Sequence, residues 1–443
     1  MRDPMRARAL SRTVVATGLA LATATTIAAT TSASAEDASG RGGVRYYDRP
    51  VAPLLPQRGL EPVRPVGPAD YTFLSAPDFM NADVADVSGL PTWHRGLPNS
   101  WNSSYAQMVD TVLDTFQAEG PDDVFVAGDL VEGHWGEDAD RTGIFGPART
   151  NAQRKAALKR TASFYFSQWR QRFEARGLPV LAALGDHDIG DNPWAGGRHA
   201  ADNRFKLHQV QTFKRAFFEK VMAAARLGNR PPGPAHGTAF ATYVAPEVLL
   251  VTVDVFRSTR RDVVTELDPQ QLRWLGRVLA AANRRGTDWI IVQGHTPVIT
   301  PVRTYGSSAM SYTGGTRSAF WKVMVKNRVD LYLNGEVHDI SVRRADGITQ
   351  VSHGGTLQMA TPNGRGATNY ALGQIYGDRL WLRDNRFAPR MVDTSAELWQ
   401  VGRTHRPVVR KEIWDEPPAQ GHLVLTSDNQ LLYSDGAFIP YAG

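Results

Sequence analysis

Five short apolar segments of this chain each lead into a turn that carries an acidic residue or a histidine. The residues in these turns are Asp78, Asp129, Asp186 with His187, His295, and Glu336 with His338. Short apolar runs that alternate with amphipathic segments are typical of the strands of an α/β domain. Because the carboxyl ends of such strands line one crevice, we expect these side chains to converge there.

Helices and strands alternate along the chain. Expected strands cover residues 71–74, 123–127, 179–184, 248–253, 289–293 and 329–334, and expected helices cover 104–118, 155–176 and 268–286. In the last helix Asp268 is the expected N-cap, Gln271 follows it at capping-box spacing and Gly286 is placed to end the helix. Turn clusters between alternating strands after about residue 370 predict a β-rich tail.

The 443 residues include no cysteine. This excludes disulfide frameworks, cysteine zinc sites, iron–sulfur clusters and thiol nucleophiles. Carboxylates and imidazoles that meet without cysteine are ligands for hard or borderline divalent ions. A single Asp or His after a strand is usually a turn residue, but five such turns in succession favour a shared metal site.

The N-terminus has the pattern of an export signal. Four arginines precede an apolar, Thr-spaced stretch over residues 14–29, and Ala33-Ser34-Ala35 follows as a cleavage site. We therefore expect residues 1–35 to be a signal peptide, residues 36–69 to be an extended arm and the protein to be secreted. Without residues 1–35 the chain keeps 46 Lys and Arg against 43 Asp and Glu, a net charge of +3.

The remaining charge and hydropathy bear on possible partners. A charge of +3, evenly spread along the sequence, does not indicate a nucleic-acid partner. No segment after the signal peptide is long and apolar enough to span a bilayer, so stable membrane insertion is not expected. No motif specifies an oligomeric state.

The order of the motifs resembles the calcineurin-like metallophosphoesterase family. That family runs Asp-x-His, Gly-Asp, Gly-Asn-His-Asp or -Glu, Gly-His and Gly-His-x-His, and the resemblance spans about residues 70–375. It implies a four-layer α/β/β/α sandwich of two mixed sheets flanked by helices. Residues 376–443 would then be a β-rich C-terminal extension.

The resemblance also implies a role for each site residue. The first of two divalent metal ions would be held by Asp78, Asp129 and His338, and the second by Asp129, Asp186, His295 and Glu336. His187 and the adjacent Asp188 would be catalytic residues, and His187 would be the acid that protonates the leaving oxygen or stabilises the transition state. The sequence does not indicate which residues bind the substrate.

Three positions depart from the family pattern. Met80 replaces a ligand histidine, Asp186 replaces an asparagine and Glu336 replaces a histidine. A thioether is a poor ligand for a hard ion, so the first site lacks one imidazole, and His353 is an alternative donor. The added oxygen donors favour manganese, iron or magnesium over zinc.

These features predict a secreted metal-dependent phosphoesterase that hydrolyses a small phosphomonoester or phosphodiester with a metal-activated hydroxide. A metal-binding pseudoenzyme that holds a phosphorylated or cell-wall ligand without turnover is the first alternative, and Met80 favours it. A glycosidase with paired carboxylates is the second alternative, although such an enzyme needs no histidine cluster.

Overall fold

The computed structural model describes the chain from residue 63 to residue 438 with gaps. The described residues are 63–78, 85–95, 97, 103–131, 133, 143–191, 200–223, 225–302, 310–355, 369–387, 390–393, 398–400, 403–405, 409–412 and 419–438. The expected signal peptide, most of the expected arm and Met80 lie outside them. The chain divides into residues 1–35 and residues 36–443, and the fold below is that of the second unit.

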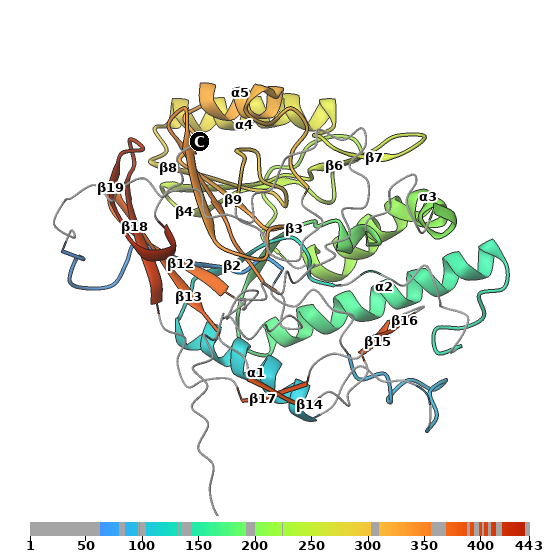
Figure 1. Ribbon diagram of the computed structural model, residues 1–443. Coiled ribbons are helices and arrows are strands. Elements are labelled where there is room, and N and C mark those ends of the chain that lie inside the picture. Colours follow the sequence, from blue (N-terminus) through green and yellow to red (C-terminus); the bar gives the residue numbers. More distant parts are fainter. Residues whose placement is uncertain are drawn as a thin grey trace, which may run out of the picture. The chain divides into compact units, whose positions relative to one another are not determined.

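The first sheet has seven strands in the order β19-β18-β13-β12-β1-β2-β3 (Figure 1). Its strands are β1 (Tyr71–Ser75), β2 (Asp123–Ala127), β3 (Val180–Ala183), β12 (Asn369–Tyr376), β13 (Arg379–Arg386), β18 (Ala419–Thr426) and β19 (Leu431–Ser434). The β1, β2 and β3 strands are parallel, and the others join antiparallel beyond β1. Strands of the β-rich C-terminal region therefore continue the sheet that begins with β1.

The second sheet has six strands in the order β10-β11-β9-β8-β5-β4. They are β4 (Phe240–Ala245), β5 (Val248–Thr252), β8 (Trp289–Gln293), β9 (Leu331–Asn334), β10 (Ser341–Ala345) and β11 (Ile348–Ser352). The four central strands are parallel and fully buried, and the two edge strands are antiparallel. Continuous apolar runs suit strands that are covered on both faces.

Short hairpins and pairs of strands complete the β-structure. They are β6 (Phe256–Ser258) with β7 (Val263–Thr265), β14 (Arg390–Asp393) with β17 (Val409–Glu412), and β15 (Leu398–Gln400) with β16 (Arg403–His405).

Helices cover the outer faces of the two sheets, which gives the four layers that the resemblance implies (Figure 1). The helices are α1 (Ser103–Ala118), α2 (Asn151–Glu174), α3 (Ala200–Phe217), α4 (Pro269–Arg285) and α5 (Ala319–Lys326). The α1 and α2 helices flank the first sheet, with α3 beside α2, and α4 and α5 lie together on the second sheet. None of the described helices is long and apolar enough to cross a membrane.

Capping residues determine where two of the helices begin. Thr150 and Gln153 form a capping box, so α2 begins before the expected residue 155. Asp268 caps α4 through the backbone N–H groups of Gln270 and Gln271, and Gly286 ends it at φ 79°. The expected capping-box role of the Gln271 side chain is wrong, because that amide bonds to the backbone of Asp254.

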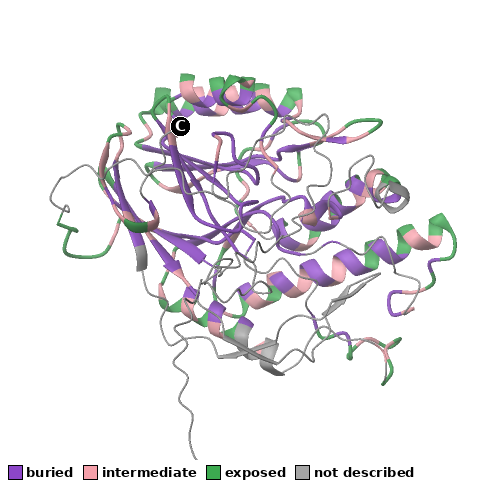
Figure 2. Cartoon of the chain, in the orientation of Figure 1, coloured by how far each residue is buried: buried purple, intermediate pink, exposed green. Residues whose placement is uncertain are grey.

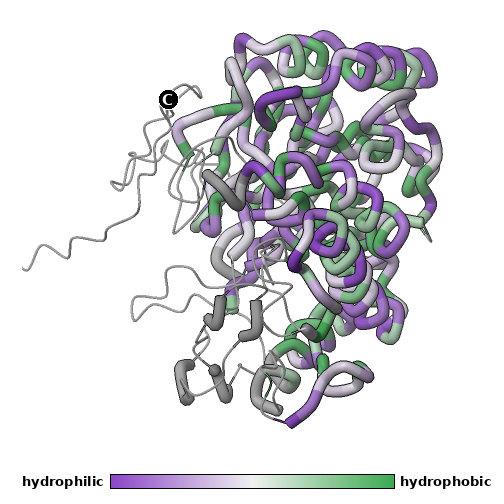
Figure 3. Tube along the Cα trace, turned by 90° about the vertical axis from the view of Figure 1, so that its right-hand side faces the viewer, coloured by the Kyte–Doolittle hydropathy of each residue, from purple (hydrophilic) through white to green (hydrophobic). Residues whose placement is uncertain are grey.

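The two sheets enclose the main hydrophobic core. Buried residues fill the strands and the inward faces of the helices (Figure 2), and hydrophilic and hydrophobic segments alternate along the helices (Figure 3). Several hydrogen bonds join the two sheets and their loops, and among them the side chains of Gln293 and Trp289 donate to the carbonyls of Leu181 and Gly377, each at 3.0 Å. Gln293 is the last residue of β8, so its bond to β3 joins the two sheets near the carboxyl ends of these strands.

Candidate metal centre

The six expected ligands all follow parallel strands, three of the first sheet and two of the second. Asp78, Asp129 and Asp186 come two or three residues after β1, β2 and β3. His295 comes two residues after β8, and Glu336 and His338 follow β9. All six side chains are buried. The structure therefore brings these six residues, which are far apart in sequence, to the same side of the two sheets.

Three carboxylates surround Nε2 of His295. The distances from this nitrogen are 3.1 Å to Asp186 Oδ1, 3.5 Å to Asp129 Oδ2 and 3.5 Å to Glu336 Oε2. Backbone N–H groups steady two of these carboxylates: His187 donates to Asp129, and Met310 donates to Glu336. These four side chains are the set expected to hold the second metal ion.

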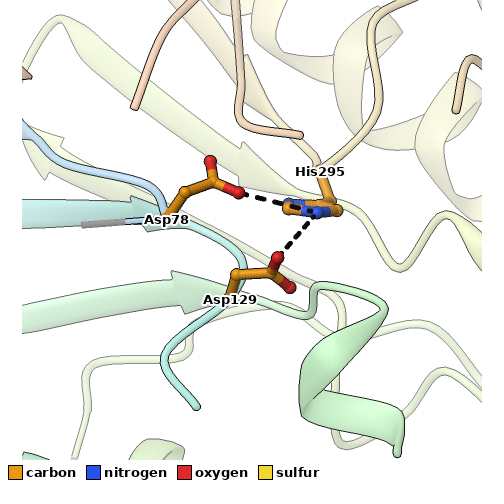
Figure 4. A group of neighbouring side chains, drawn as sticks. All are labelled: Asp78, Asp129 and His295. Carbon is orange, nitrogen blue, oxygen red and sulfur yellow. Dashed lines mark ion pairs between the residues drawn. The ribbon is translucent and has the colours of Figure 1, made fainter. Parts of the chain in front are cut away.

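Asp78 is the fourth carboxylate near His295, and it also lies near His338. Its Oδ1 is 3.5 Å from Nε2 of His338 and 4.0 Å from Nε2 of His295. Figure 4 shows Asp78 and Asp129 pointing at His295 from two neighbouring loops. The backbone N–H of Glu336 donates to both oxygens of Asp78, at 3.2 and 3.1 Å. His338 therefore lies beside Asp78, but among the described residues it does not belong to any group of three ligand atoms that lie close together, so its role in the first site stays a prediction.

The tautomer of His295 follows from one hydrogen bond. Its Nδ1 lies 2.8 Å from the carbonyl oxygen of Ala127, which can only accept, so Nδ1 carries the hydrogen. In the neutral ring, the lone pair of Nε2 then faces the carboxylates. Burial alone would lower the pKa of His295, but the adjacent carboxylates, Asp129 foremost, raise it well above its usual value. The geometry is that of an imidazole poised to bind a cation.

The cluster as a whole is short of positive charge. Four buried carboxylates face two buried imidazoles, and burial raises the pKa of Asp129 while Oδ2 of Asp186 has no hydrogen-bond partner within the described residues. Three groups each place three ligand atoms within 4.8 Å of one another: Asp78 with Asp129 and His295, Asp129 with Asp186 and His187, and Asp186 with His295 and Glu336. Oxygen-rich donor sets of this kind fit divalent cations.

Four of these residues adopt a left-handed backbone conformation. The φ angles are 56° at Asp78, 60° at Asp129, 72° at Glu336 and 52° at His338. Each such residue costs about 1–3 kcal/mol, and such strain clusters at functional sites. The sequence shows the turns but not this conformation.

Two glycines leave room for the carboxylates rather than for an ion. A Cβ on Gly185 would overlap the carboxylate of Asp129, and one on Gly335 would overlap that of Asp78. Gly185 thus lies against the carboxylate that follows the adjacent strand β2, and Gly335 lies against the carboxylate that follows β1 of the other sheet.

Asp188 lies behind the cluster with both oxygens occupied by backbone groups. They accept from the N–H of Gly185 at 2.8 Å and from those of Asp129 and Leu130 at 3.0 Å. Burial nevertheless raises the pKa of Asp188 to about 7. This carboxylate ties the Asp129 turn to the Asp186 turn.

His187 lies at the more open edge of the site, with 16% of its side chain exposed. Its Nδ1 is 3.5 Å from Oδ1 of Asp191, and Oδ2 of Asp191 is 3.6 Å from Nζ of the buried Lys206. Neither Asp191 nor Lys206 was expected at the site from the sequence. The only signal in the sequence is that Asp191 follows His187 by four residues.

His353 is held beside the centre rather than within it. Its Nε2 lies 2.9 Å from Oγ of Ser75, and burial lowers its pKa to about 3. Among the described residues it does not belong to any of the three groups of ligand atoms. The adjacent Gly354 lies against Asp78, where an added Cβ would come within 2.6 Å of Oδ2.

Comparison with known proteins places these residues in a family. A family model for calcineurin-like phosphoesterases matches residues 93–339, more than half of the chain. An acid phosphatase of Aspergillus ficuum is 38% identical over 69 residues, which are 16% of this chain and only 10% of that protein.

Two solved structures are similar in fold at low identity. GAP50 of Plasmodium has a TM-score of 0.40 and 12% identity, with 77% of this chain and 90% of that chain covered. A putative 5'-nucleotidase from Staphylococcus aureus has a TM-score of 0.34 and 10% identity, with 68% of this chain and 50% of that chain covered. On the strength of the family match, which includes five of the six proposed ligands, this chain belongs to the calcineurin-like phosphoesterase family.

Proposed function

We propose that the protein is a metal-dependent phosphoesterase that hydrolyses a small phosphomonoester or phosphodiester. The observation that carries the proposal is the convergence of three carboxylates within 3.5 Å of Nε2 of His295, a nitrogen that the bond between Nδ1 and Ala127 orients toward them. The family match over residues 93–339 supports the same reaction class.

The residues divide into two proposed ligand sets. The first set is Asp78, Asp129 and His338, and the second is Asp129, Asp186, His295 and Glu336. When bound, divalent cations supply the positive charge that polarises phosphoryl oxygens and makes water a better nucleophile near neutral pH. The strained turns at Asp78 and Asp129 hold their carboxylates at the meeting point of the two sheets.

His187 is the proposed acid. Oδ1 of Asp191 lies 3.5 Å from Nδ1 and orients the ring, so that Nε2 is the nitrogen proposed to hold the proton for the leaving oxygen. Lys206 holds Asp191 from the opposite side. Asp188, whose oxygens are taken up by backbone N–H groups, is proposed to position the two turns rather than to transfer a proton.

The reaction class can be tested with the purified full chain. It is stripped of metal with a chelator, reloaded with manganese, iron, magnesium or zinc, and assayed with p-nitrophenyl phosphate and bis(p-nitrophenyl) phosphate. We expect hydrolysis to be lost on stripping and restored by an oxygen-preferring ion. Protein that binds metal stoichiometrically but hydrolyses neither ester would instead support the pseudoenzyme, and chelator-insensitive hydrolysis would contradict a metal mechanism.

Export is part of the proposal and rests on the sequence of residues 1–35. The arginine-rich start, the apolar stretch and Ala33-Ser34-Ala35 favour cleavage before Glu36. N-terminal sequencing of the protein recovered from the medium tests this. Protein found only inside cells would contradict it.

A further inference from the structure

The outermost helices, α4 and α5, are strongly basic. Neither contains an aspartate or a glutamate. Their exposed cations are Arg273, Arg277, Arg284 and Arg285 of α4 and Lys322 and Lys326 of α5. In the described part of the chain, no ion pair involves any of these side chains.

Five of the cations share one surface. Arg273, Arg277 and Arg284 are spaced by four and seven residues, which places them in one stripe along α4. The buried stripe of that helix, centred on Leu275 and Leu279, lies on the opposite side. Arg285 points elsewhere, since its guanidinium lies over the ring of Tyr243, 4.1 Å from the centroid.

The second helix repeats this arrangement. Lys322 and Lys326 are four residues apart on the side of α5 away from its buried Phe320 and Met324. The two helices lie side by side, with exposed residues on the outward side (Figure 2), and the side chain of Asn283 on α4 donates to a carbonyl directly after α5. We call these five side chains, Arg273, Arg277, Arg284, Lys322 and Lys326, the basic helical face.

Within the described residues, the two aspartates next to these helices form no ion pair with the basic helical face. Asp268, the N-cap of α4, accepts from the first backbone N–H groups of its own helix, and Asp346 accepts from the indole of Trp321. Arg317 and Arg328, also exposed, add positive charge at the two ends of α5. Like charges four residues apart on a helix repel each other, so stability of the fold does not account for the arrangement.

The shape of the face distinguishes between possible anionic partners. The stripe on α4 is about 16 Å long at 1.5 Å per residue, and the adjacent helix widens it into a broad surface. Within the described residues, the exposed large hydrophobic side chains are Val63 and Val66, so the face has no aromatic platform on which bases could stack. Clusters of four to eight Lys and Arg on amphipathic helices are typical of surfaces that bind anionic lipids.

We propose that the basic helical face docks the protein onto an anionic lipid bilayer through charge alone. The face lies on the outer side of α4 and α5, whereas the metal centre lies at the strand ends, so docking leaves the centre accessible. The attachment requires no inserted segment. It is independent of the proposed hydrolysis, because none of the five cations belongs to the metal centre.

Vesicle sedimentation tests the proposal with the full chain. Vesicles of phosphatidylcholine alone are compared with vesicles that contain about 30% phosphatidylglycerol. We expect binding only to the anionic vesicles, and release when the salt rises from about 50 mM to about 500 mM. Substitution of all five cations by Gln should weaken binding by at least about 100-fold, since each cation near the surface contributes a factor of about five.

A matched variant removes the same charge from the α2 and α3 side of the molecule. It carries Arg149→Gln, Lys155→Gln, Lys159→Gln, Arg204→Gln and Arg215→Gln, all at exposed positions. We expect it to bind anionic vesicles like the wild type, and thermal melts confirm that both variants fold. If the five-site variant fails to fold, Lys322→Gln with Lys326→Gln should still lower the affinity more than tenfold.

Three results would overturn the proposal. The first is a wild type that does not bind anionic vesicles. The second is an equal loss of binding in the matched variant, which would mean that only the net charge matters. The third is a wild type that binds long-chain polyphosphate or DNA but not vesicles, which would make the partner a linear polyanion.

Discussion

Substitutions of Asp188 test how the turns that carry Asp129 and Asp186 are held together. Its buried carboxylate accepts three backbone hydrogen bonds, from Gly185 at 2.8 Å and from Asp129 and Leu130 at 3.0 Å. Asp188→Ala leaves three buried donors unpaired, each at a cost of about 1–3 kcal/mol, so the loss is about 3–9 kcal/mol. Because a domain is stable by only about 5–15 kcal/mol, this variant should be severely destabilised or unfolded.

The milder variant Asp188→Asn keeps the shape of the side chain. Its single amide oxygen cannot accept from all three backbone N–H groups, and its NH₂ group repels the N–H group that remains unpaired. We therefore expect the free energy of unfolding to fall by about 2–4 kcal/mol. Urea unfolding of chelator-treated protein measures this loss without any contribution from bound metal. Metal content should also fall, because the affected turns present Asp129 and Asp186.

Asp330 provides a matched control. It is also a buried aspartate, but it lies at the start of β9, away from the centre, where its carboxylate accepts from the backbone N–H of Ile290 at 2.7 Å. Asp330→Asn should lower stability and leave metal content unchanged. A change in the unfolding free energy of less than about 0.5 kcal/mol in Asp188→Asn, or an equal loss of metal in Asp330→Asn, would refute this role of Asp188.

Three further predictions concern single side chains. Asp129→Ala should abolish metal binding and hydrolysis, whereas His187→Ala should keep its metal and hydrolyse about 10²–10⁴-fold more slowly. Elemental analysis measures the metal content, and an equal loss of metal in the two variants would contradict these roles. Glu336→His should shift the metal preference toward zinc and the alkaline-going limb of the pH–rate profile to lower pH, and an unchanged preference would remove Glu336 from the ligands. Burial lowers the pKa of His353 to about 3, so its contribution to stability is complete above about pH 6.5 and is lost as the pH falls. In urea titrations from about pH 6 to pH 4, the unfolding free energy of the chelator-treated wild type should therefore fall by about 1.4 kcal/mol per pH unit more than that of His353→Gln, and parallel curves would refute this.

The strands were predictable where burial on both sides makes them uniformly apolar. The β2 and β8 strands have the same bounds as expected from the sequence, and both are entirely buried. The α5 helix was missed, because eight mostly apolar residues do not reveal a helical period. The edge strand β10 was missed as well, since its Arg343-Arg344 pair interrupts the apolar pattern.

The sequence indicated which strand ends carry ligands but not how the ends support one another. That Gly185 lies against the carboxylate of Asp129 depends on the pairing of β2 with β3, which no local pattern specifies. The same holds for the contact between His187 and Asp191, which depends on a left-handed turn at φ 54°. The basic helical face was hidden for a similar reason, since α4 and α5 are separated by more than thirty residues in the sequence.

The departures from the family pattern have one electrostatic consequence in common. Asp186 and Glu336 replace neutral side chains, and both lie within 3.5 Å of Nε2 of His295, so the cluster holds four carboxylates instead of two. Four negative charges balance two divalent cations before any substrate binds. The centre should therefore attract an anionic ester less strongly than a neutral-ligand site and acidify bound water less. Positive charge elsewhere on the molecule does not compensate, because at physiological salt the potential of exposed cations decays over about 8 Å.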